Sequence, residues 1–295
     1  MGDALKHMHP PYLTPQAIHD FIVLALAEDI GNGDPSSDGA IPENTNTQAR
    51  LLVKEAGVIA GLEVAEKIFM QFDPTLRVEF SKADGDEIHP GEVAFIVRGN
   101  ARSILSTERV VLNCLQRMSG IATFTRRLCK QLEGTKARLM DTRKTTPNFR
   151  LMEKWAVHIG GGLNHRFALY SMIMLKDNHI DLAGDIQTAI NNTRRHLQET
   201  KKELSIEIET RNLTEVAEVL STGGVETIML DNMSINDMRT AVKLIDGKFK
   251  TEASGGITEE NLRAVAQCGV DYISVGALTH SVKSLDLSLK VMVSQ

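Results

Sequence analysis

The chain of 295 residues lacks long apolar runs, and this absence excludes whole classes of protein. No stretch approaches the ~18 consecutive apolar residues that a membrane-spanning helix needs. The N-terminal segment from Met1 to Pro11 lacks the apolar core of a secretory signal peptide. These absences predict a cytoplasmic protein that is not inserted in a membrane.

Cysteines are also few, and acidic residues outnumber basic ones by 38 to 33. The only cysteines are Cys114, Cys129 and Cys268, with no Cys-x-x-Cys spacing, so neither a disulfide framework nor a zinc site is predicted. The formal net charge of −5 argues against a wide nucleic-acid-binding surface. Any strongly cationic site must therefore be local.

The residues that are present predict an ordinary globular protein with two domains. Hydrophobic residues make up 42% and charged residues 24% of the chain, and these fractions are typical of a folded soluble protein. A single core stops growing near ~250–300 residues, so this length suits one large core and one smaller one. We expect a first domain at residues 1–117 and a second domain at 118–281. A last helix at 282–295 is expected to pack back on the first domain.

The first domain shows a helix, a connection and a small sheet. Thr14 and Pro15 are a typical helix start, and this helix is expected to end near Asp29. The segment Ile30 to Asn46 is rich in Gly, Pro, Asn and Ser, so we expect an ordered connection without a regular element. Strands at 48–53, 76–80 and 92–97, a helix at 61–72, and one or two long helices at 101–134 are predicted next.

From residue 136 onward, strands and helices alternate. Repeated strand–helix units favour a (β/α) barrel. Six strands are two fewer than a closed barrel has, so the barrel is incomplete or two strands escape the pattern. The predicted strands are Arg138–Met140, Met172–Leu175, Leu204–Ile208, Thr227–Leu230, Thr251–Ala253 and Tyr272–Val275.

Polar or glycine residues follow each of these six strands at once. Active sites of such barrels form at the carboxyl ends of the strands. One polar strand end alone is more often plain surface. Six of them together predict one shared site.

The last two strand ends carry glycine, in Ser254-Gly255-Gly256 and in Ser274-Val275-Gly276-Ala277. Glycine lets backbone N–H groups approach a phosphate, and the N-terminus of a following helix favours an anion. Glycine also serves ordinary tight turns. The position at the last two strands of a barrel favours the phosphate site.

Two carboxylates are expected at the same edge. Glu207 and Asp231 are predicted to end neighbouring strands, with Glu209 on the same strand face as Glu207. Carboxylates beside a polyphosphate are natural partners of Mg²⁺, often through water. The alternative is that these are solvated acids at strand ends. The prediction is a Mg²⁺ cofactor held by Glu207 and Asp231.

Cations face these acids in the same motifs. They are Arg143, Lys144, Arg166 and Lys176, and His165 precedes Arg166. An arginine grips a carboxylate through two parallel hydrogen bonds, so two arginines can bind two carboxylates. The expected substrate therefore carries several negative charges.

These motifs resemble the quinolinate phosphoribosyltransferase family, also called nicotinate-nucleotide pyrophosphorylase (carboxylating). The resemblance covers nearly the whole chain, with Ser36-Ser37 as a local departure after EDIGNGD at 28–34. Its motifs are Glu108-Arg109, SGIAT at 119–123, DTRKTTP at 141–147, GGGLNHR at 160–166, KDNH at 176–179, MLDN at 229–232, EASGGI at 252–257 and SVGALTH at 274–280.

The resemblance implies a homodimer with a shared active site. Each subunit would contain an N-terminal α/β sandwich domain and a C-terminal incomplete α/β barrel. It implies an enzyme that joins phosphoribosyl pyrophosphate to quinolinate with decarboxylation, in NAD biosynthesis. The residues that it assigns to quinolinate are Arg143, His165, Arg166 and Lys176, with Lys144 nearby and Arg109 of the partner subunit. The residues that it assigns to phosphoribosyl pyrophosphate and Mg²⁺ are Glu207 and Asp231, with Ser254, Gly255, Gly256, Gly276 and His280 at the 5′-phosphate.

Within that set, Lys144, Lys176, Glu207 and Asp231 are the expected catalytic residues. The sequence does not show which catalytic role belongs to Lys144 and which to Lys176. Two other functions stay open. One is a related phosphoribosyltransferase that acts on another carboxylated ring, and the other is a non-catalytic sensor of phosphoribosyl pyrophosphate.

Overall fold

The computed structural model describes residues 9–292 and divides the chain into two compact units. Among these residues, the first unit comprises 9–126, 145–161 and 278–292, and the second comprises Arg127–Lys144 and Gly162–Ala277. The units thus interleave along the chain. Whether residues 1–117 and 118–281 fold as separate domains stays a prediction.

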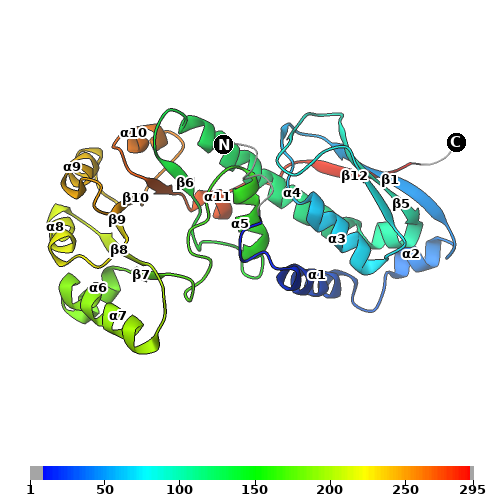
Figure 1. Cartoon of the computed structure of the whole chain (residues 1–295). Coiled ribbons are helices and arrows are strands. Elements are labelled where there is room, and N and C mark those ends of the chain that lie inside the picture. Colours follow the sequence, from blue (N-terminus) through cyan, green and yellow to red (C-terminus); the bar gives the residue numbers. More distant parts are fainter. Residues whose placement is uncertain (1–8, 293–295) are drawn as a thin grey trace. The chain divides into compact units, whose positions relative to one another are not determined.

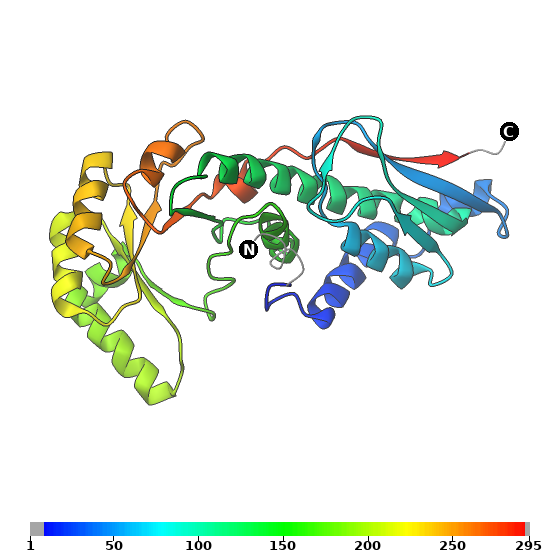
Figure 2. The same ribbon diagram turned by 45° about the horizontal axis from the view of Figure 1, so that its top comes forward.

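The first unit is built on an antiparallel sheet with the strand order β12-β1-β5-β3 (Figure 2). Along β1, Ala49, Leu51 and Val53 are buried whereas Gln48 and Arg50 are exposed. This alternation is typical of a sheet with one face in the core. The strands are β1 (Asn46–Val53), β3 (Arg77–Phe80), β5 (Val93–Asn100) and β12 (Leu287–Met292), and β2 (Gly57–Val58) pairs with β4 (Glu87–Ile88).

Helices of the first unit cover the apolar face of this sheet. The rings of Phe69 in α3 and Phe95 in β5 meet edge to face, with their centroids 6.0 Å apart. Gly120 lets the backbone near Lys283 approach α4, because a Cβ at Gly120 would lie 2.3 Å from the Lys283 carbonyl oxygen. No helix among residues 9–292 is long and apolar enough to cross a membrane. The helices are α1 (Pro15–Ile30), α2 (Pro35–Ala40), α3 (Leu62–Phe72), α4 (Ala101–Gln131) and α5 (Arg150–Ile159).

Two sequence predictions for this unit are wrong. The segment 30–46 contains the short helix α2, because Asp34 accepts hydrogen bonds from the N–H groups of Ser36 and Ser37 and Pro35 supplies the first helical residue. Residues 282–295 were predicted to form a helix, but 282–286 are irregular and Leu287–Met292 form the strand β12. Leu287 and Leu289 are buried at alternate positions, and β12 pairs with β1.

The second unit contains a parallel sheet with the order β6-β11-β10-β9-β8-β7 (Figure 1). No pairing joins β6 to β7 within residues 9–292, so the barrel is incomplete, as predicted. The strands are β6 (Arg138–Met140), β7 (Ile173–Leu175), β8 (Ile206–Thr210), β9 (Thr227–Asp231), β10 (Lys250–Ser254) and β11 (Tyr272–Ser274). The helices are α6 (Asp177–Ala183), α7 (Ile186–Thr200), α8 (Leu213–Thr222), α9 (Ile235–Ile245) and α10 (Leu262–Ala266), and α11 (Ala277–His280) begins at the last residue of this unit.

The central strand β8 is buried along its whole length. Helices α8 and α9 lie along one side of the sheet (Figure 1), and both Ile208 in β8 and Val216 in α8 have no exposed surface. Side chains alternate between the two faces of a strand, so Glu207 and Glu209 project to the face opposite Ile208. The sheet therefore carries buried carboxyl groups on one face.

Candidate functional site

The strand register gathers polar side chains on this face of the second unit. Glu209 pairs with Met229, and Met229 pairs with Glu252 on the next strand. Residues two positions apart in a strand point to the same face. Asp231 therefore lies on the face of Met229, and Ser254 lies on the face of Glu252. Four of the six strands thus contribute to one polar surface, since Lys176 follows β7 directly.

Asp141 anchors the loop that precedes β7. Its fully buried carboxylate accepts hydrogen bonds from the Asn164 amide, at 2.7 Å, and from the His165 backbone N–H, at 2.9 Å. Leu163 adds a strand-like bond, because its N–H donates to the carbonyl oxygen of Leu139 at 2.8 Å. These bonds hold His165 beside the end of β6.

His165 contacts two buried glutamates. Its Nε2 lies 2.9 Å from Oε2 of Glu207 and 3.6 Å from Oε2 of Glu252. Burial raises the pKa of Glu207 to about 7, and burial together with the charge of Glu207 raises the pKa of Glu252 to about 8. The interior of the sheet thus favours the neutral form of at least one of these acids.

Arg143 and Arg166 interact electrostatically in this unit. Burial lowers the pKa of Arg166, and repulsion by Arg143 lowers it further, whereas Glu207 and Glu209 raise it. Two half-buried guanidinium groups that repel each other are stabilised by an anionic ligand between them. The structure therefore brings together the two predicted arginines.

The two predicted lysines differ in their surroundings. Lys176 ends β7, and its ammonium group pairs with the carboxylate of Glu209. Lys144 is exposed, and its backbone N–H donates to the Thr142 hydroxyl at 3.0 Å. Lys176 is thus held against the polar face, while the side chain of Lys144 lies at the surface.

Glu207 does not end its strand, contrary to the sequence prediction. It is the second residue of β8 and pairs with Thr227, whereas Asp231 is the last residue of β9. Four residues at ~3.3 Å each separate Asp231 from Thr227 by about 13 Å along the strand. Glu209, which pairs with Met229, is two residues closer to Asp231. The acids near the carboxyl ends are therefore Glu209 and Asp231.

The predicted phosphate loops follow β10 and β11. Gly255 and Gly256 have positive φ angles of 85° and 60°, which glycine adopts without strain. A Cβ at Gly255 would lie 2.2 Å from the Asn232 side chain, so Asn232 packs closely against this loop. Gly276 directly precedes α11. Phosphate binding by these segments stays a prediction.

Arg109 and His280 belong to the first unit. Arg109 is exposed on α4, and Nδ1 of His280 lies 2.6 Å from the Ser281 hydroxyl. Their roles toward substrate, and the origin of Arg109 in a partner subunit, stay predictions.

Two buried acids were missed at the sequence level. Glu252 lies two residues before Ser254, and side chains two positions apart in a strand point to the same face. This spacing could have placed Glu252 beside the predicted site residue Ser254. Glu153 in α5 is fully buried and accepts hydrogen bonds from the guanidinium of Arg117 and from the backbone and hydroxyl of Thr146. No sequence pattern pointed to Glu153, because its partners are distant in the chain or lie in an irregular loop.

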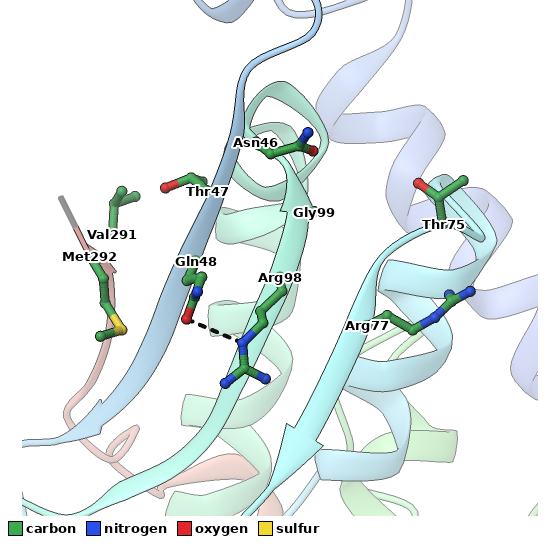
Figure 3. Close-up of a pocket in the computed structure, with 9 residues that line it drawn as sticks. All are labelled: Asn46, Thr47, Gln48, Thr75, Arg77, Arg98, Gly99, Val291 and Met292. Carbon is green, nitrogen blue, oxygen red and sulfur yellow. Dashed lines mark hydrogen bonds between the residues drawn. The ribbon is translucent and has the colours of Figure 1, made fainter. Parts of the chain in front are cut away.

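A separate hollow of about 710 Å³ lies on the sheet of the first unit (Figure 3). Arg98 there donates to Gln48 and pairs with Glu79, and Arg77 donates to backbone carbonyls. None of the predicted site residues lines it. The lining residues are Asn46, Thr47, Gln48, Thr75, Arg77, Arg98, Gly99, Val291 and Met292.

Known proteins resemble this chain over nearly its whole length. Residues 26–119 match the family model of the quinolinate phosphoribosyl transferase N-terminal domain, and residues 121–290 match that of the C-terminal domain. Quinolinate phosphoribosyltransferase [decarboxylating] 1 of Nicotiana glauca is 45% identical, over 96% of this chain and 83% of the relative. A probable nicotinate-nucleotide pyrophosphorylase [carboxylating] of Bacillus subtilis (strain 168) is 44% identical, over 90% and 91%.

A solved structure shares the same fold. The crystal structure of NadC from Streptococcus pyogenes superposes with a TM-score of 0.89 at 41% identity, over 95% of this chain and 98% of that one. Both domain models, the identity of the relatives and the fold agree. The chain belongs to the quinolinate phosphoribosyltransferase family.

Proposed function

We propose that this chain transfers the phosphoribosyl group of phosphoribosyl pyrophosphate to quinolinate. The products are nicotinate mononucleotide, pyrophosphate and CO₂, as a step of NAD biosynthesis. The relatives carry this activity in their names. The observation that carries the proposal is the pair Arg143 and Arg166, which interact within a polar face that also holds Lys176.

The residues suit this chemistry through electrostatics, without a covalent nucleophile. Arg143 and Arg166 would each bind one carboxylate of quinolinate and orient the pyridine nitrogen toward the anomeric carbon of the ribose. As pyrophosphate leaves, positive charge develops on the ribose, and Glu209 and Asp231 are the acids that would stabilise it. After transfer, the cationic ring nitrogen accepts the electrons released when the adjacent carboxylate departs as CO₂.

Magnesium is part of the proposal, with Asp231 as its protein partner. Mg²⁺ commonly binds one or two carboxylates together with substrate phosphates. Asp231 suits this role because it ends β9, and its Oδ2 accepts only one described hydrogen bond, from Asn232 at 2.7 Å. Glu207 does not suit it, since its Oε2 faces His165 inside the sheet. Bound Mg²⁺ would supply positive charge to the leaving pyrophosphate.

A homodimer with Arg109 of the partner subunit in each site also belongs to the proposal, as does a cytoplasmic location. The exposure of Arg109 on α4 suits an intersubunit role. The location is supported by free cysteines, of which Cys114 is buried. Several plant relatives are named mitochondrial or chloroplastic, so cell fractionation with an antibody to this chain is the direct measurement.

Turnover with defined substrates tests the proposed function. The purified protein is incubated with phosphoribosyl pyrophosphate, Mg²⁺ and quinolinate labelled in the carboxylate next to nitrogen. Labelled CO₂ and nicotinate mononucleotide should appear in equal amounts. Nicotinate is the matched control, because loss of one carboxylate leaves a cation unpartnered and should lower kcat/KM by about 30-fold or more. Equal kcat/KM values for both acids would contradict the assignment.

The same assay addresses the two other functions. A sensor would bind phosphoribosyl pyrophosphate without releasing pyrophosphate. A related transferase would release pyrophosphate with another carboxylated ring and not with quinolinate. Neither alternative is favoured by a feature of the described residues.

A further inference from the structure

Three titratable side chains are buried together beside Arg166, and the proposed chemistry gives none of them a role. His165, Glu207 and Glu252 are 9%, 2% and 0% exposed. One nitrogen or oxygen atom from each lies within 4.8 Å of those of the other two. Buried polar groups in folded proteins have hydrogen-bond partners, so this group needs an arrangement of protons that satisfies it.

The contacts of His165 determine where its proton lies. The backbone N–H of Arg166 donates to Nδ1 of His165 at 2.7 Å, so Nδ1 carries no proton. The ring proton is then on Nε2, which donates to Oε2 of Glu207 at 2.9 Å. His165 is therefore neutral, with both nitrogens engaged.

Glu252 accepts no hydrogen bond from Nε2 of His165. Its Oε2 lies 3.6 Å from Nε2, which is too long for a hydrogen bond. Neither oxygen of Glu252, nor Oε1 of Glu207, has a hydrogen-bond partner of normal geometry. The Ser274 hydroxyl and His165 favour ionised Glu252, but burial and the charge of Glu207 oppose ionisation more strongly and raise the pKa of Glu252 to about 8. A proton shared with Glu207 satisfies the pair.

A metal ion fits this group less well than a proton. An ion bound to His165 would take the lone pair of Nε2, and the ring proton would move to Nδ1. The Arg166 N–H already points at Nδ1. Two N–H groups would then face each other, so the hydrogen bond to Arg166 excludes a cation on Nε2.

We propose that Glu252 is held as a neutral carboxylic acid that donates to Glu207, and that this pair orients His165 and, through its ring, the backbone of Arg166. Glu252, Glu207 and His165 are then positioning residues for the arginine that binds quinolinate. The proposal rests on the proposed function in one respect, the assignment of Arg166 to a carboxylate of quinolinate. It replaces direct binding of quinolinate by His165.

The proposal predicts an alkaline effect on quinolinate binding. Because the pKa of Glu252 is raised to about 8, its neutral form persists below that pH and is lost above it. Ionised Glu252 would add a negative charge near Arg166 and repel the dicarboxylate, so the KM for quinolinate should rise above pH about 8. Besides each other, the charged or titratable groups that shift the pKa values of Glu207 and Glu252 are His165, Arg166, Lys176 and Glu209. Arg143 in turn shifts the pKa of Arg166.

Infrared spectroscopy tests the shared proton without reference to activity. Glutamine at 252 reproduces the shape and the donor of a neutral glutamic acid, so Glu252→Gln should fold. The spectrum of the wild-type protein near pH 7 should contain a protonated-carboxyl band that this variant lacks. Asp84, whose pKa burial raises to about 6, contributes equally to both spectra and cancels. Identical spectra, or stoichiometric Zn²⁺ retained by the wild type and absent from Glu252→Gln, would overturn the proposal.

Kinetics test the positioning role. Glu252→Gln should keep kcat and the KM for quinolinate within about twofold at pH 7 and abolish the alkaline rise in KM. Glu252→Met, which has no donor, should raise the KM for quinolinate about tenfold with little change in kcat, as expected for one lost hydrogen bond to a charged group. The matched control Glu79→Gln, on the sheet of the first unit, should keep the wild-type pH profile. An alkaline rise that persists in Glu252→Gln would refute the positioning role.

Different results would contradict the proposed function and the shared proton. Absence of turnover with quinolinate in the wild type would count against the proposed function. Identical infrared spectra would count against the shared proton even in a fully active enzyme.

Discussion

Strands β1 and β8 are both interior strands of their sheets, yet they place charge in opposite ways. In β1, Arg50 is exposed and the alternate residues are apolar and buried. In β8, all five residues are buried and two of them are Glu207 and Glu209. A buried charge costs free energy unless it is paired or protonated. The second sheet retains such residues, and the positioning role proposed for Glu207 requires one of them.

The largest expected difference between the two sheets concerns their arginines. Arg166→Ala should lower kcat/KM for quinolinate about 10³-fold, because a carboxylate of the substrate loses its partner in a desolvated site. Arg98→Ala is the matched change on the first sheet, where Arg98 pairs with Glu79 at 2.6 Å near the surface. It should leave kcat/KM within about twofold. Steady-state kinetics of both variants measure these changes. Equal losses of kcat/KM in the two variants would contradict a special role of Arg166.

Stability separates buried from exposed ion pairs within the first unit. Glu153 is fully buried against Arg117 at 2.8 Å, so Glu153→Ala should lower the free energy of unfolding by about 3–5 kcal/mol. Glu79→Ala breaks the exposed pair with Arg98 and should cost about 0–1 kcal/mol. Urea unfolding gives both values. A small effect of Glu153→Ala would show that burial of this pair contributes little.

A smaller effect is expected at the end of β9. Asp231→Asn should raise the KM for phosphoribosyl pyrophosphate about tenfold and leave the KM for quinolinate nearly unchanged, since the dicarboxylate is assigned to the cations. Asp246→Asn, at the exposed C-terminus of α9, is the matched control. Titration with Mg²⁺ completes the test. Full activity in excess chelator would contradict the metal proposal.

The last contrast tests the proposal that Arg109 acts in the site of a partner subunit. Arg109→Ala and Arg166→Ala homodimers should both be nearly inactive. In a two-fold dimer with exchanged Arg109 residues, a mixed dimer contains one intact and one doubly changed site. Random exchange of equal amounts should therefore restore about a quarter of the wild-type sites. No recovery after exchange, verified by differential tagging, would place Arg109 outside the partner's site.

Much of the second unit was predictable because its signals are local. The strand at Arg138–Met140 was predicted to the residue, and the other five lie within two residues of their predicted ends. Apolar runs bounded by glycine and charged residues mark such strands without knowledge of their neighbours. Arg143 and Arg166, which interact electrostatically, were both named from the family motifs, and their binding of quinolinate stays a prediction.

The errors arose where distant segments meet. The apolar residues of 287–292 suit a helix or a strand, and only pairing with the edge of β1 makes them a strand. Glu207 was placed at a strand end because the sequence does not state how far β8 continues. Pairing with β9 extends β8 to Thr210 and leaves Glu207 inside.

The sequence by itself therefore determined the alternation of strands and helices in the second unit, the chemical groups of the candidate site and the family, because periodicity, turn residues and motifs are carried by neighbouring residues. The tertiary structure alone decided which groups touch. Glu252 and Glu207 lie on strands separated by β9, and His165 comes from a loop held by Asp141. Their meeting, and the proton that it requires, depend on strand register and burial, which no local pattern encodes.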